Sequence, residues 1–300
     1  MPYSLSDKLV IGISSRALFN LERENQIYEQ HGVDAYAAFQ REHENDPLQP
    51  GSAFPLVKAL LHLNRLMPED QRLIEVVVIS RNTPDTGLRA FNAIEEHGLD
   101  ISRAAFTGGA PVMTPYINAF EVDLFLSRSQ DDVQLAVNSG VAAAQLVDLP
   151  ADFSAPTDQI RIAFDGDAVL FDPESEEYFQ QHGLEKFLER EKRLRGQPMG
   201  RGPFAKLLIM LAELQQRFPA ESCPIRIAIV TARNSPAHAR VVHTLRNWNV
   251  SVNEAFFLGG VPKAKVLQAF GAHIFFDDQD THVQAAASVV PAGKVPYARV

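Results

Sequence analysis

Residues 162–171 read IAFDGDAVLF, an apolar run that stops at two aspartates, Asp165 and Asp167, and then becomes apolar again. The run is typical of a buried strand, and the glycine between the aspartates lets the backbone turn sharply. Open α/β sheets bind their ligands just outside the carboxyl ends of the strands. Two carboxylates crowded at such a place need a cation, so this stretch predicts an α/β fold with a cation site at a strand end.

The chain also repeats itself. Four segments of the first half recur in the same order about 151 residues later. The pairs are IGISSRALF (11–19) with IAFDGDAVL (162–170), VISRNTP (78–84) with VTARNSP (230–236), AFTGGAP (105–111) with FFLGGVP (256–262), and AFEVDLFLSRSQDDVQLA (119–136) with AFGAHIFFDDQDTHVQAA (269–286). Four matches at a nearly constant offset indicate two tandem copies of one unit. The proline-containing stretch 148–159 is the predicted join.

Apolar runs within each copy alternate with helical patterns, which is typical of parallel sheets covered by helices. The strands are expected at 9–13, 74–79, 122–126, 161–164, 225–230 and 273–276. We predict one unit over residues 1–150 with a helical insert at about 20–70, and a second over 158–300 with an insert at about 172–222. Each insert follows the first strand of its unit, so it is a candidate cap over the strand ends.

Composition narrows the function classes. The 300 residues are 46% hydrophobic and 22% charged, as in globular proteins, and the formal net charge of -9 disfavours nucleic-acid binding. No apolar run approaches the roughly 20 residues of a membrane helix, so no membrane partner is expected. The one cysteine, Cys223, and the absence of a secretory pattern at the N-terminus favour a cytoplasmic protein. A homo-oligomer remains an open alternative.

The second half carries residues suited to phosphoryl chemistry at or just after its expected strand ends. They are Asp165, Asp167, Thr231, Lys263, Asp277 and Asp278. Clustered carboxylates repel each other unless a divalent ion lies between them, and hard oxygen ligands select Mg²⁺. Taken alone, the aspartate pair at 165 and 167 would better suit a turn that caps the next helix; the catalytic interpretation depends on the other residues of this set. Spacing also leaves Lys265 open as an alternative to Lys263.

The order Asp-x-Asp, Thr, Lys, Asp-Asp resembles the haloacid dehalogenase superfamily of phosphatases. More closely, the strings SSRALF, HENDPLQPG, TGGAP, FDGDAVLF, ESE, VTAR, GGVPK and HIFFDDQ resemble the cytosolic 5'-nucleotidase type I family, from about Ser14 to Val295. The resemblance implies haloacid-dehalogenase-like units with caps, and hydrolysis through an aspartyl-phosphate on Asp165. Asp167 would protonate the leaving oxygen and later activate water.

The same resemblance implies the remaining roles. Thr231 and Lys263 would hold the transferring phosphoryl group, and Mg²⁺ would be bound by Asp165, the main-chain oxygen of Asp167 and Asp278. Asp277 would orient a metal-bound water or Lys263, although the sequence leaves open which of the two adjacent aspartates is the ligand. The substrate-binding candidates are Gly166, Ala232, Arg233 and Arg201. Arg233 is equally open to a structural role, and Arg201 to a plain connecting loop.

The expected reaction is Mg²⁺-dependent hydrolysis of nucleoside 5'-monophosphates, with AMP as the favoured substrate on the family resemblance. Two alternatives remain. A phosphatase for another small phosphate, such as a sugar phosphate, would use the same phosphoryl site. A nucleotide-binding sensor with vestigial catalysis would explain why half of the chain has lost these residues.

The first half replaces every residue of this set. Alignment of the repeats puts Ser14 at the place of Asp165, Arg16 at Asp167, Ile79 at Thr231, Val112 at Lys263, and Ser127 and Arg128 at Asp277 and Asp278. We therefore expect a degenerate unit that binds no metal, because arginines repel Mg²⁺. Its arginines Arg16, Arg81 and Arg128 either pair with local acids or hold an anion such as a regulatory nucleotide.

Overall fold

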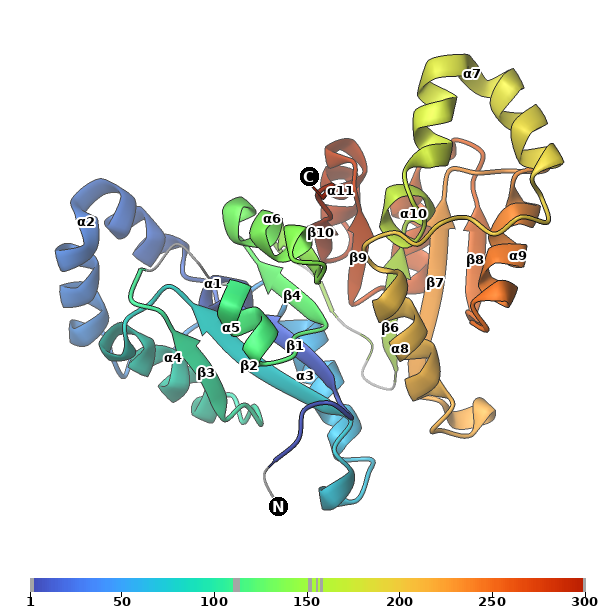
Figure 1. Ribbon diagram of the computed structural model, residues 1–300. Helices are drawn as coiled ribbons and strands as arrows, with labels where there is room; N and C mark the ends of the chain where they lie inside the picture. The colour runs from blue at the N-terminus through green and yellow to red at the C-terminus, as the bar shows by residue number, and fades with distance from the viewer. Residues whose placement is uncertain (1–2, 110–113, 151–152, 155, 157–158, 299–300) are drawn as a thin grey trace. The chain divides into compact units, whose positions relative to one another are not determined.

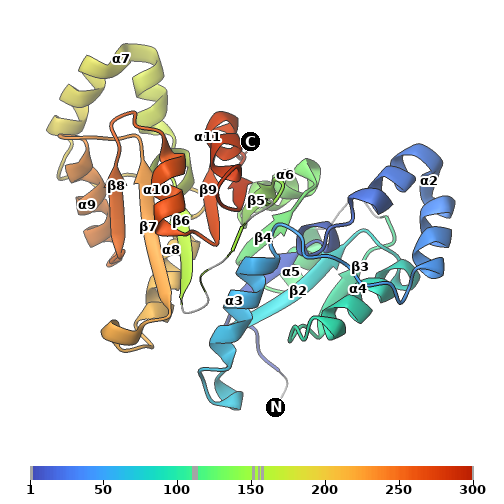
Figure 2. The same cartoon turned by 180° about the vertical axis from the view of Figure 1, so that it is seen from behind.

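The computed structural model describes residues 3–109, 114–150, 153–154, 156 and 159–298. The chain divides into two compact units, Met1–Val141 and Ala142–Val300. This division comes earlier than the predicted one near residue 150, because the strand that follows Val141 pairs within the second unit. Figures 1 and 2 show the α/β architecture of each unit from opposite sides.

Unit 1 contains a parallel sheet in the order β3-β2-β1-β4. Every residue of β1 and β2 is buried, as expected for parallel strands covered on both faces. The strands are β1 (Leu9–Ile13), β2 (Ile74–Ser80), β3 (Arg103–Phe106) and β4 (Leu124–Ser127). The helices are α1 (Ser15–Leu18), α2 (Glu22–Glu42), α3 (Phe54–Asn64), the 3-10 turn η1 (Glu69–Gln71), α4 (Pro84–Glu96), α5 (Thr114–Ala119) and α6 (Gln130–Asn138).

Unit 2 contains strands in the order β5-β10-β9-β6-β7-β8, parallel except for the antiparallel pair β5 and β10. The strands are β5 (Ala142–Leu146), β6 (Ile160–Phe164), β7 (Ile225–Thr231), β8 (Glu254–Phe257), β9 (Ile274–Asp277) and β10 (Ala292–Lys294). The helices are the π-type turn η2 (Gly166–Leu170), α7 (Glu174–Arg193), α8 (Ala205–Gln215), the 3-10 turn η3 (Ala220–Ser222), α9 (His238–Asn247), α10 (Lys263–Phe270) and α11 (Asp280–Ala287).

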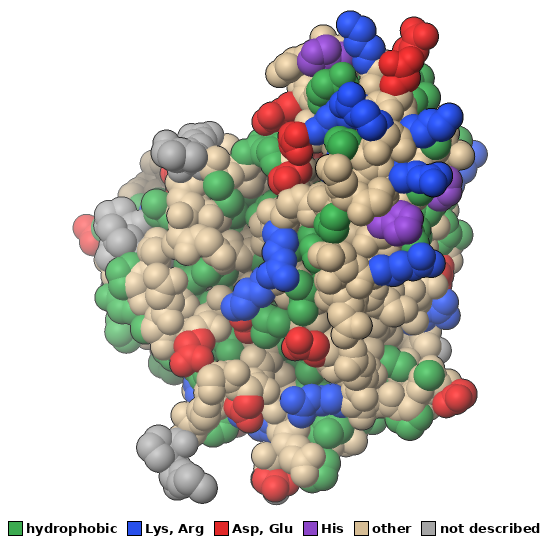
Figure 3. Space-filling view, turned by 45° about the vertical axis from the view of Figure 1, so that its right-hand side comes forward, with side chains coloured by type: hydrophobic (Ala, Val, Ile, Leu, Met, Phe, Trp, Pro, Cys, Tyr) green, Lys and Arg blue, Asp and Glu red, His purple; other side chains and the backbone are tan. Residues whose placement is uncertain are grey.

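Helices cover both faces of each sheet. In Figure 1, α5 lies in front of the strands of unit 1 and α8 in front of those of unit 2. In the reverse view of Figure 2, α3 and α10 take these places. The core of unit 2 includes Ala228 and Val230 of β7, Leu267 and Phe270 of α10, and Phe275 of β9. Outside the core, basic, acidic and apolar side chains mix over the face drawn in Figure 3, as is usual for a globular surface.

The predicted mixed α/β fold with mostly parallel strands is confirmed, and all six expected strands are present to within about two residues. The order is similar in the two units, since β1 lies between β2 and β4, and β6 lies between β7 and β9. The helices α2 and α7 come after β1 and β6, at the predicted inserts, and each is interrupted by a left-handed glycine, Gly32 (φ 82°) or Gly183 (φ 77°). None of the helices in the described part of the chain is long and apolar enough to cross a membrane.

Candidate active site

The candidate site of unit 2 lies at the carboxyl edge of three neighbouring parallel strands. Asp165 follows β6, Thr231 ends β7, and Asp277 ends β9. The backbone N–H of Asp165 donates to the carbonyl of Phe276 in β9 at 2.8 Å, which ties the two acidic strand ends together. The sheet register therefore gathers residues that are more than 100 positions apart in sequence.

A buried lysine bridges two of these acids. Lys263 Nζ lies 2.7 Å from Asp165 Oδ1 and 2.6 Å from Asp277 Oδ2. The lysine begins α10, and its side chain is only 5% exposed. Lys265, the alternative cation, is exposed. The structure thus places Lys263, not Lys265, against the acids.

Burial and mutual repulsion shape the charges of this cluster. Burial raises the pKa of Asp165 to about 7, in spite of the opposing attraction of Lys263. Burial also raises the pKa of Asp278. The pKa of Asp277 is lowered instead, because its contacts with His282 and Lys263 outweigh its burial. One lysine therefore does not neutralise the three acids, and the cluster attracts further positive charge.

The same acids are a plausible set of metal ligands by chemistry and spacing. Asp165, Asp277 and Asp278 each offer a carboxylate oxygen, and these oxygens lie within 4.8 Å of one another. Carboxylate oxygens are the hard ligands that Mg²⁺ prefers. Asp277 already contacts Lys263 and accepts the N–H of Gln279 at 2.9 Å. Asp278 has one side-chain partner that sequence reasoning did not anticipate, the hydroxyl of Tyr297 at 2.5 Å.

Asp167 has a different environment. Arg233 donates from Nε to Asp167 Oδ2 at 2.8 Å and from Nη2 to Oδ1 at 2.7 Å. Its Nη1 reaches Glu191 Oε2 of α7 at 2.5 Å. The pKa of Arg233 is raised, since these two acids outweigh the effect of burial. Of the two roles left open for Arg233, these contacts favour the structural one, because its nitrogen donors are directed at protein groups.

The other sequence candidates lie as follows. Thr231 is 1% exposed and its hydroxyl accepts the N–H of Arg233 at 3.2 Å. A Cβ at Gly166 would lie 3.3 Å from that hydroxyl, so Gly166 borders Thr231 closely. Ala232 lies between Thr231 and Arg233 and is exposed. Arg201 lies with its guanidinium 5.9 Å from the ring centre of Trp248, so its part in substrate binding stays a prediction.

The matching edge of unit 1 carries hydroxyls where unit 2 carries acids. Ser14 follows β1 and its N–H donates to Leu126, as that of Asp165 does to Phe276. Ser127 ends β4 and accepts an N–H two residues on, as Asp277 does. Val112, the residue aligned with Lys263, lies outside the described residues.

One sequence equivalence is wrong by a residue. The register pairs Ile13 with Val78 in unit 1 and Phe164 with Ile229 in unit 2. Counting on from these pairs, Ser80 rather than Ile79 takes the place of Thr231, and Asn82 rather than Arg81 takes the place of Arg233. The same backbone contact marks both positions, because the N–H of Asn82 donates to Ser80 Oγ as that of Arg233 does to Thr231.

The arginines of unit 1 pair with acids nearby. Arg16 and Arg128 both contact Glu22, at 3.1 and 3.0 Å, and Arg81 contacts Asp132 at 2.5 Å. Of the two expectations for these arginines, pairing with local acids is the one present. An anion site would have to compete with these contacts.

Three residues of the unit 2 site escaped sequence reasoning: Glu191, His282 and Tyr297. Glu191 is completely buried, and besides Arg233 it contacts Arg240 at 2.9 Å. His282 Nδ1 lies 3.3 Å from Asp277 Oδ2. Glu191 lies in the charged run EREKR (189–193), where nothing in the sequence indicates a buried acid or a partner 42 residues away.

Comparisons with known proteins show the family of the chain. A family model described as 5'-nucleotidase matches residues 1–300. The chain is 38% identical over 294 residues to "Cytosolic 5'-nucleotidase 1B" of Homo sapiens, a match that covers 95% of this chain and 48% of that protein. The chain thus spans about half the length of this curated relative.

A solved structure named "Putative Universal Stress Protein", from Pseudomonas aeruginosa UCBPP-PA14, can be superposed on this chain. The match covers 97% of this chain and 94% of that one. Its TM-score is 0.36 at 10% identity, a likeness too low to support an argument. Family membership therefore rests on the family model, which matches the whole sequence. By that match, the chain belongs to the 5'-nucleotidase family of enzymes.

Proposed function

We propose that this chain hydrolyses nucleoside 5'-monophosphates to nucleoside and phosphate through an aspartyl-phosphate on Asp165. The observation that carries the proposal is the contact of Lys263 with both Asp165 and Asp277, next to Asp278, at one strand edge. Family membership and the name of the human relative support the same substrate class.

In the first step a carboxylate oxygen of Asp165 attacks phosphorus in line, and the bond from phosphorus to the ribose 5'-oxygen breaks. Asp167 gives a proton to that leaving oxygen. In the second step Asp167 removes a proton from water, which attacks the phosphorus and releases phosphate and the Asp165 carboxylate. Lys263 and the hydroxyl of Thr231 hold the phosphoryl oxygens.

Arg233 positions Asp167 in this scheme. Both carboxylate oxygens of Asp167 accept hydrogen bonds from Arg233, which fixes the orientation of the carboxylate. Transfer of a proton to or from Asp167 requires that one of these contacts loosens.

Mg²⁺ is the proposed cofactor. Asp165, Asp278 and the main-chain oxygen of Asp167 would hold it, with Asp277 left to orient Lys263. When bound, the ion offsets negative charge on the phosphoryl oxygens. We favour Asp278 over Asp277 as ligand, since Asp277 is already engaged with Lys263 and Gln279.

We further propose that the chain arose by duplication and that the copy at about 1–150 is degenerate, whereas the copy at 158–300 is catalytic. The common strand order and the matched hydrogen bonds of Ser14 with Asp165 and Ser127 with Asp277 support this. AMP as preferred substrate and a cytosolic location follow the resemblance and the name of the human relative.

The test is phosphate release from a panel of nucleoside and sugar monophosphates, with Mg²⁺ and with chelator. Asp165→Asn should abolish turnover, and the matched control Asp280→Asn, whose side chain is 69% exposed, should not. Preference for sugar phosphates would indicate a phosphatase for other small phosphates instead of a nucleotidase. No turnover of any phosphate by the wild type would favour a nucleotide sensor.

A further inference from the structure

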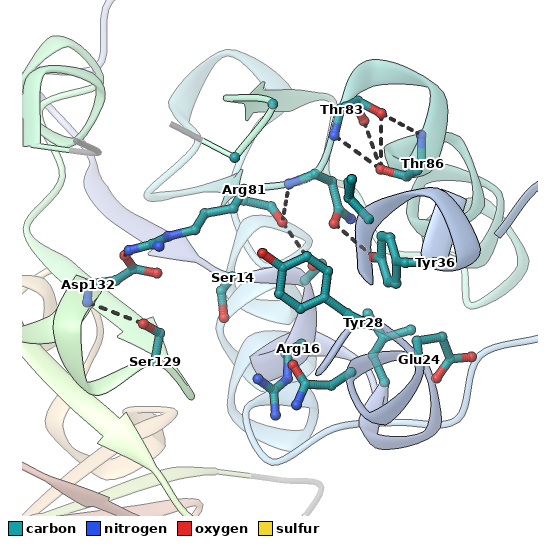
Figure 4. Close-up of a pocket in the computed structure, with 18 of the residues that line it drawn as sticks. Ser14, Arg16, Glu24, Tyr28, Tyr36, Arg81, Thr83, Thr86, Ser129 and Asp132 are labelled. Atoms are coloured by element: carbon teal, nitrogen blue, oxygen red, sulfur yellow. Dashed lines mark hydrogen bonds and ion pairs between the residues drawn. The ribbon is translucent and has the colours of Figure 1, made fainter. Parts of the chain in front are cut away.

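A cavity of about 330 Å³ opens at the carboxyl edge of unit 1, beneath the cap helix α2. Hydroxyl groups of Ser14, Ser80 and Ser129 lie on its strand side, and Tyr28 and Tyr36 of α2 lie on its cap side. In Figure 4 the ring of Tyr28 lies between the strand-end residues and the cap. The cavity has the size and the mixed lining of small-molecule sites, yet its edge lacks the acids of unit 2.

The cap side repeats an aromatic pair of unit 2. Tyr28 and Tyr36 meet edge to face at 6.0 Å, and the residues 151 positions later, Phe179 and Phe187, do so at 5.7 Å. Tyr28 is 53% exposed and Phe179 is 38% exposed. A large ring left this exposed at the same place in both units is poorly explained by core packing and suits contact with a ligand.

The second ring of each pair touches the same place on the strand edge. In unit 2 the guanidinium of Arg233, which holds Asp167, lies 5.4 Å from the centre of the Phe187 ring. In unit 1 the Tyr36 hydroxyl donates to Asn82, the register equivalent of Arg233, at 2.9 Å. The aromatic pair therefore borders the reaction site of unit 2 and the cavity of unit 1 in the same way.

Each charged residue that lines the cavity is already paired. These residues are Arg16, Arg81, Glu24 and Asp132, two of each sign. Arg81 pairs with Asp132 at 2.5 Å, Glu24 pairs with Arg89 at 2.8 Å, and Arg16 pairs with Glu22 at 3.1 Å, an acid that it shares with Arg128. A phosphate dianion would therefore have to compete with an acid for either lining arginine. Aromatic rings and hydroxyls suit instead a neutral ligand with a flat ring and a sugar.

We propose that this cavity is a second nucleoside-binding site, which holds a nucleoside without transforming it. The ligand class rests on the proposed function: if unit 2 acts on nucleoside 5'-monophosphates, the Phe179 and Phe187 pair beside Arg233 is the part of the cap that would contact the nucleoside. Unit 1 keeps the aromatic pair and a hydroxyl at Ser80, but it has Ser14 where the nucleophile stands. Unit 1 would therefore bind a nucleoside but could not hydrolyse a phosphate ester.

Equilibrium dialysis of the full chain with adenosine, guanosine, cytidine and uridine, each without phosphate, tests this site. Tyr28→Ala should weaken binding of the preferred nucleoside at one site by about tenfold or more, the size expected when an aromatic stack is lost. Tyr28→Phe, which copies Phe179, should retain binding. Phe179→Ala is the matched control, since it should weaken the other site and leave this one intact.

Photolabelling with an azido derivative of the preferred nucleoside locates the site independently. Labelled peptides from residues 22–42, protected by unlabelled nucleoside, are expected. Label confined to unit 2, or binding of all four nucleosides unaffected by Tyr28→Ala, overturns the proposal. Tighter binding of inorganic phosphate or of a 5'-monophosphate at the Tyr28-dependent site overturns the choice of a neutral ligand.

These results separate the two proposals. If the wild type releases phosphate but no Tyr28-dependent nucleoside binding exists, only the second site fails. If no phosphate is released from any nucleotide while the peptides of α2 are still labelled, the catalytic proposal fails and the second site stands. Circular dichroism of Tyr28→Ala, an exposed position, checks that the variant is folded.

Discussion

Replacement of Lys263 by methionine should destabilise unit 2 in the absence of divalent ions. The variant keeps a side chain of similar length but removes the cation that lies 2.7 Å from Asp165 and 2.6 Å from Asp277. Removal of one partner from a buried ion pair costs about 3–5 kcal/mol, because the remaining charge is left buried and uncompensated. Protonation of the acids reduces the loss, so it should be larger at alkaline pH than at acidic pH.

Mg²⁺ should reverse much of this loss. An ion that binds only the folded protein adds about 2.7 kcal/mol at a concentration one hundred times its dissociation constant. Since the lysine and the ion compensate the same acids, Mg²⁺ should stabilise Lys263→Met more than it stabilises the wild type. This readout needs no turnover, so it tests the charge balance of the site separately from catalysis.

The assay is urea unfolding of wild type, Lys263→Met and Lys265→Met, each with chelator and with Mg²⁺. Lys265 is exposed two residues further on, and its replacement should change the free energy of unfolding by less than about 0.5 kcal/mol. Equal stability of the two variants in chelator would refute the reasoning. So would a Mg²⁺ effect that is no larger in Lys263→Met than in the wild type.

Three further outcomes are expected. Arg233→Lys should lower phosphate release and cost about 1–3 kcal/mol of stability, because lysine cannot reproduce the two-pronged contact with the acid; unchanged steady-state kinetics would contradict this. Gly202→Ala should cost about 1–3 kcal/mol in urea unfolding, since its Cβ would lie 2.5 Å from backbone oxygens, whereas Gly196→Ala, with open space around it, serves as control. Tyr3 should ionise with a pKa of about 12, raised by burial and by its hydrogen bond to Glu75. This hydrogen bond should therefore stabilise the fold fully below pH 10 and be lost as pH rises through 12. Phenolate absorbance of the wild type compared with Tyr3→Phe measures the ionisation.

Sequence reasoning located the fold well where strands are fully buried. The strands β1, β2, β6 and β7 are rich in buried apolar residues, with at most one charged side chain in each, and each was predicted to within one residue. The short strands β3 and β8 were not delimited, because their side chains are mostly half-buried and carry little apolar signal. Tertiary pairing, not local pattern, makes these segments strands.

The site was predictable only in part, and for a physical reason. Acids and lysine at strand ends converge because parallel strands share an edge, so Asp165, Lys263 and Asp277 could be grouped from order alone. Ile79 was wrongly aligned with Thr231 because the sequence match of the repeats included the loops after the strands, and these loops differ by one residue. The register of the strands aligns Ser80 with Thr231. The ion pair of Arg233 with Glu191 depends on how α7 packs against the end of β7, and this packing cannot be predicted from the spacing of residues in the sequence.

The cap of unit 2 enters and leaves the fold through one connection between β6 and β7, where an isolated bridge joins Phe171 to Arg201. The acids stand on strands held by the sheet, whereas the ring of Phe179 stands on the inserted segment. The two parts can consequently change at different rates over evolutionary time. Under the proposed function, exchange of this insert would alter the surface offered to the base and leave the proposed bond-breaking residues untouched.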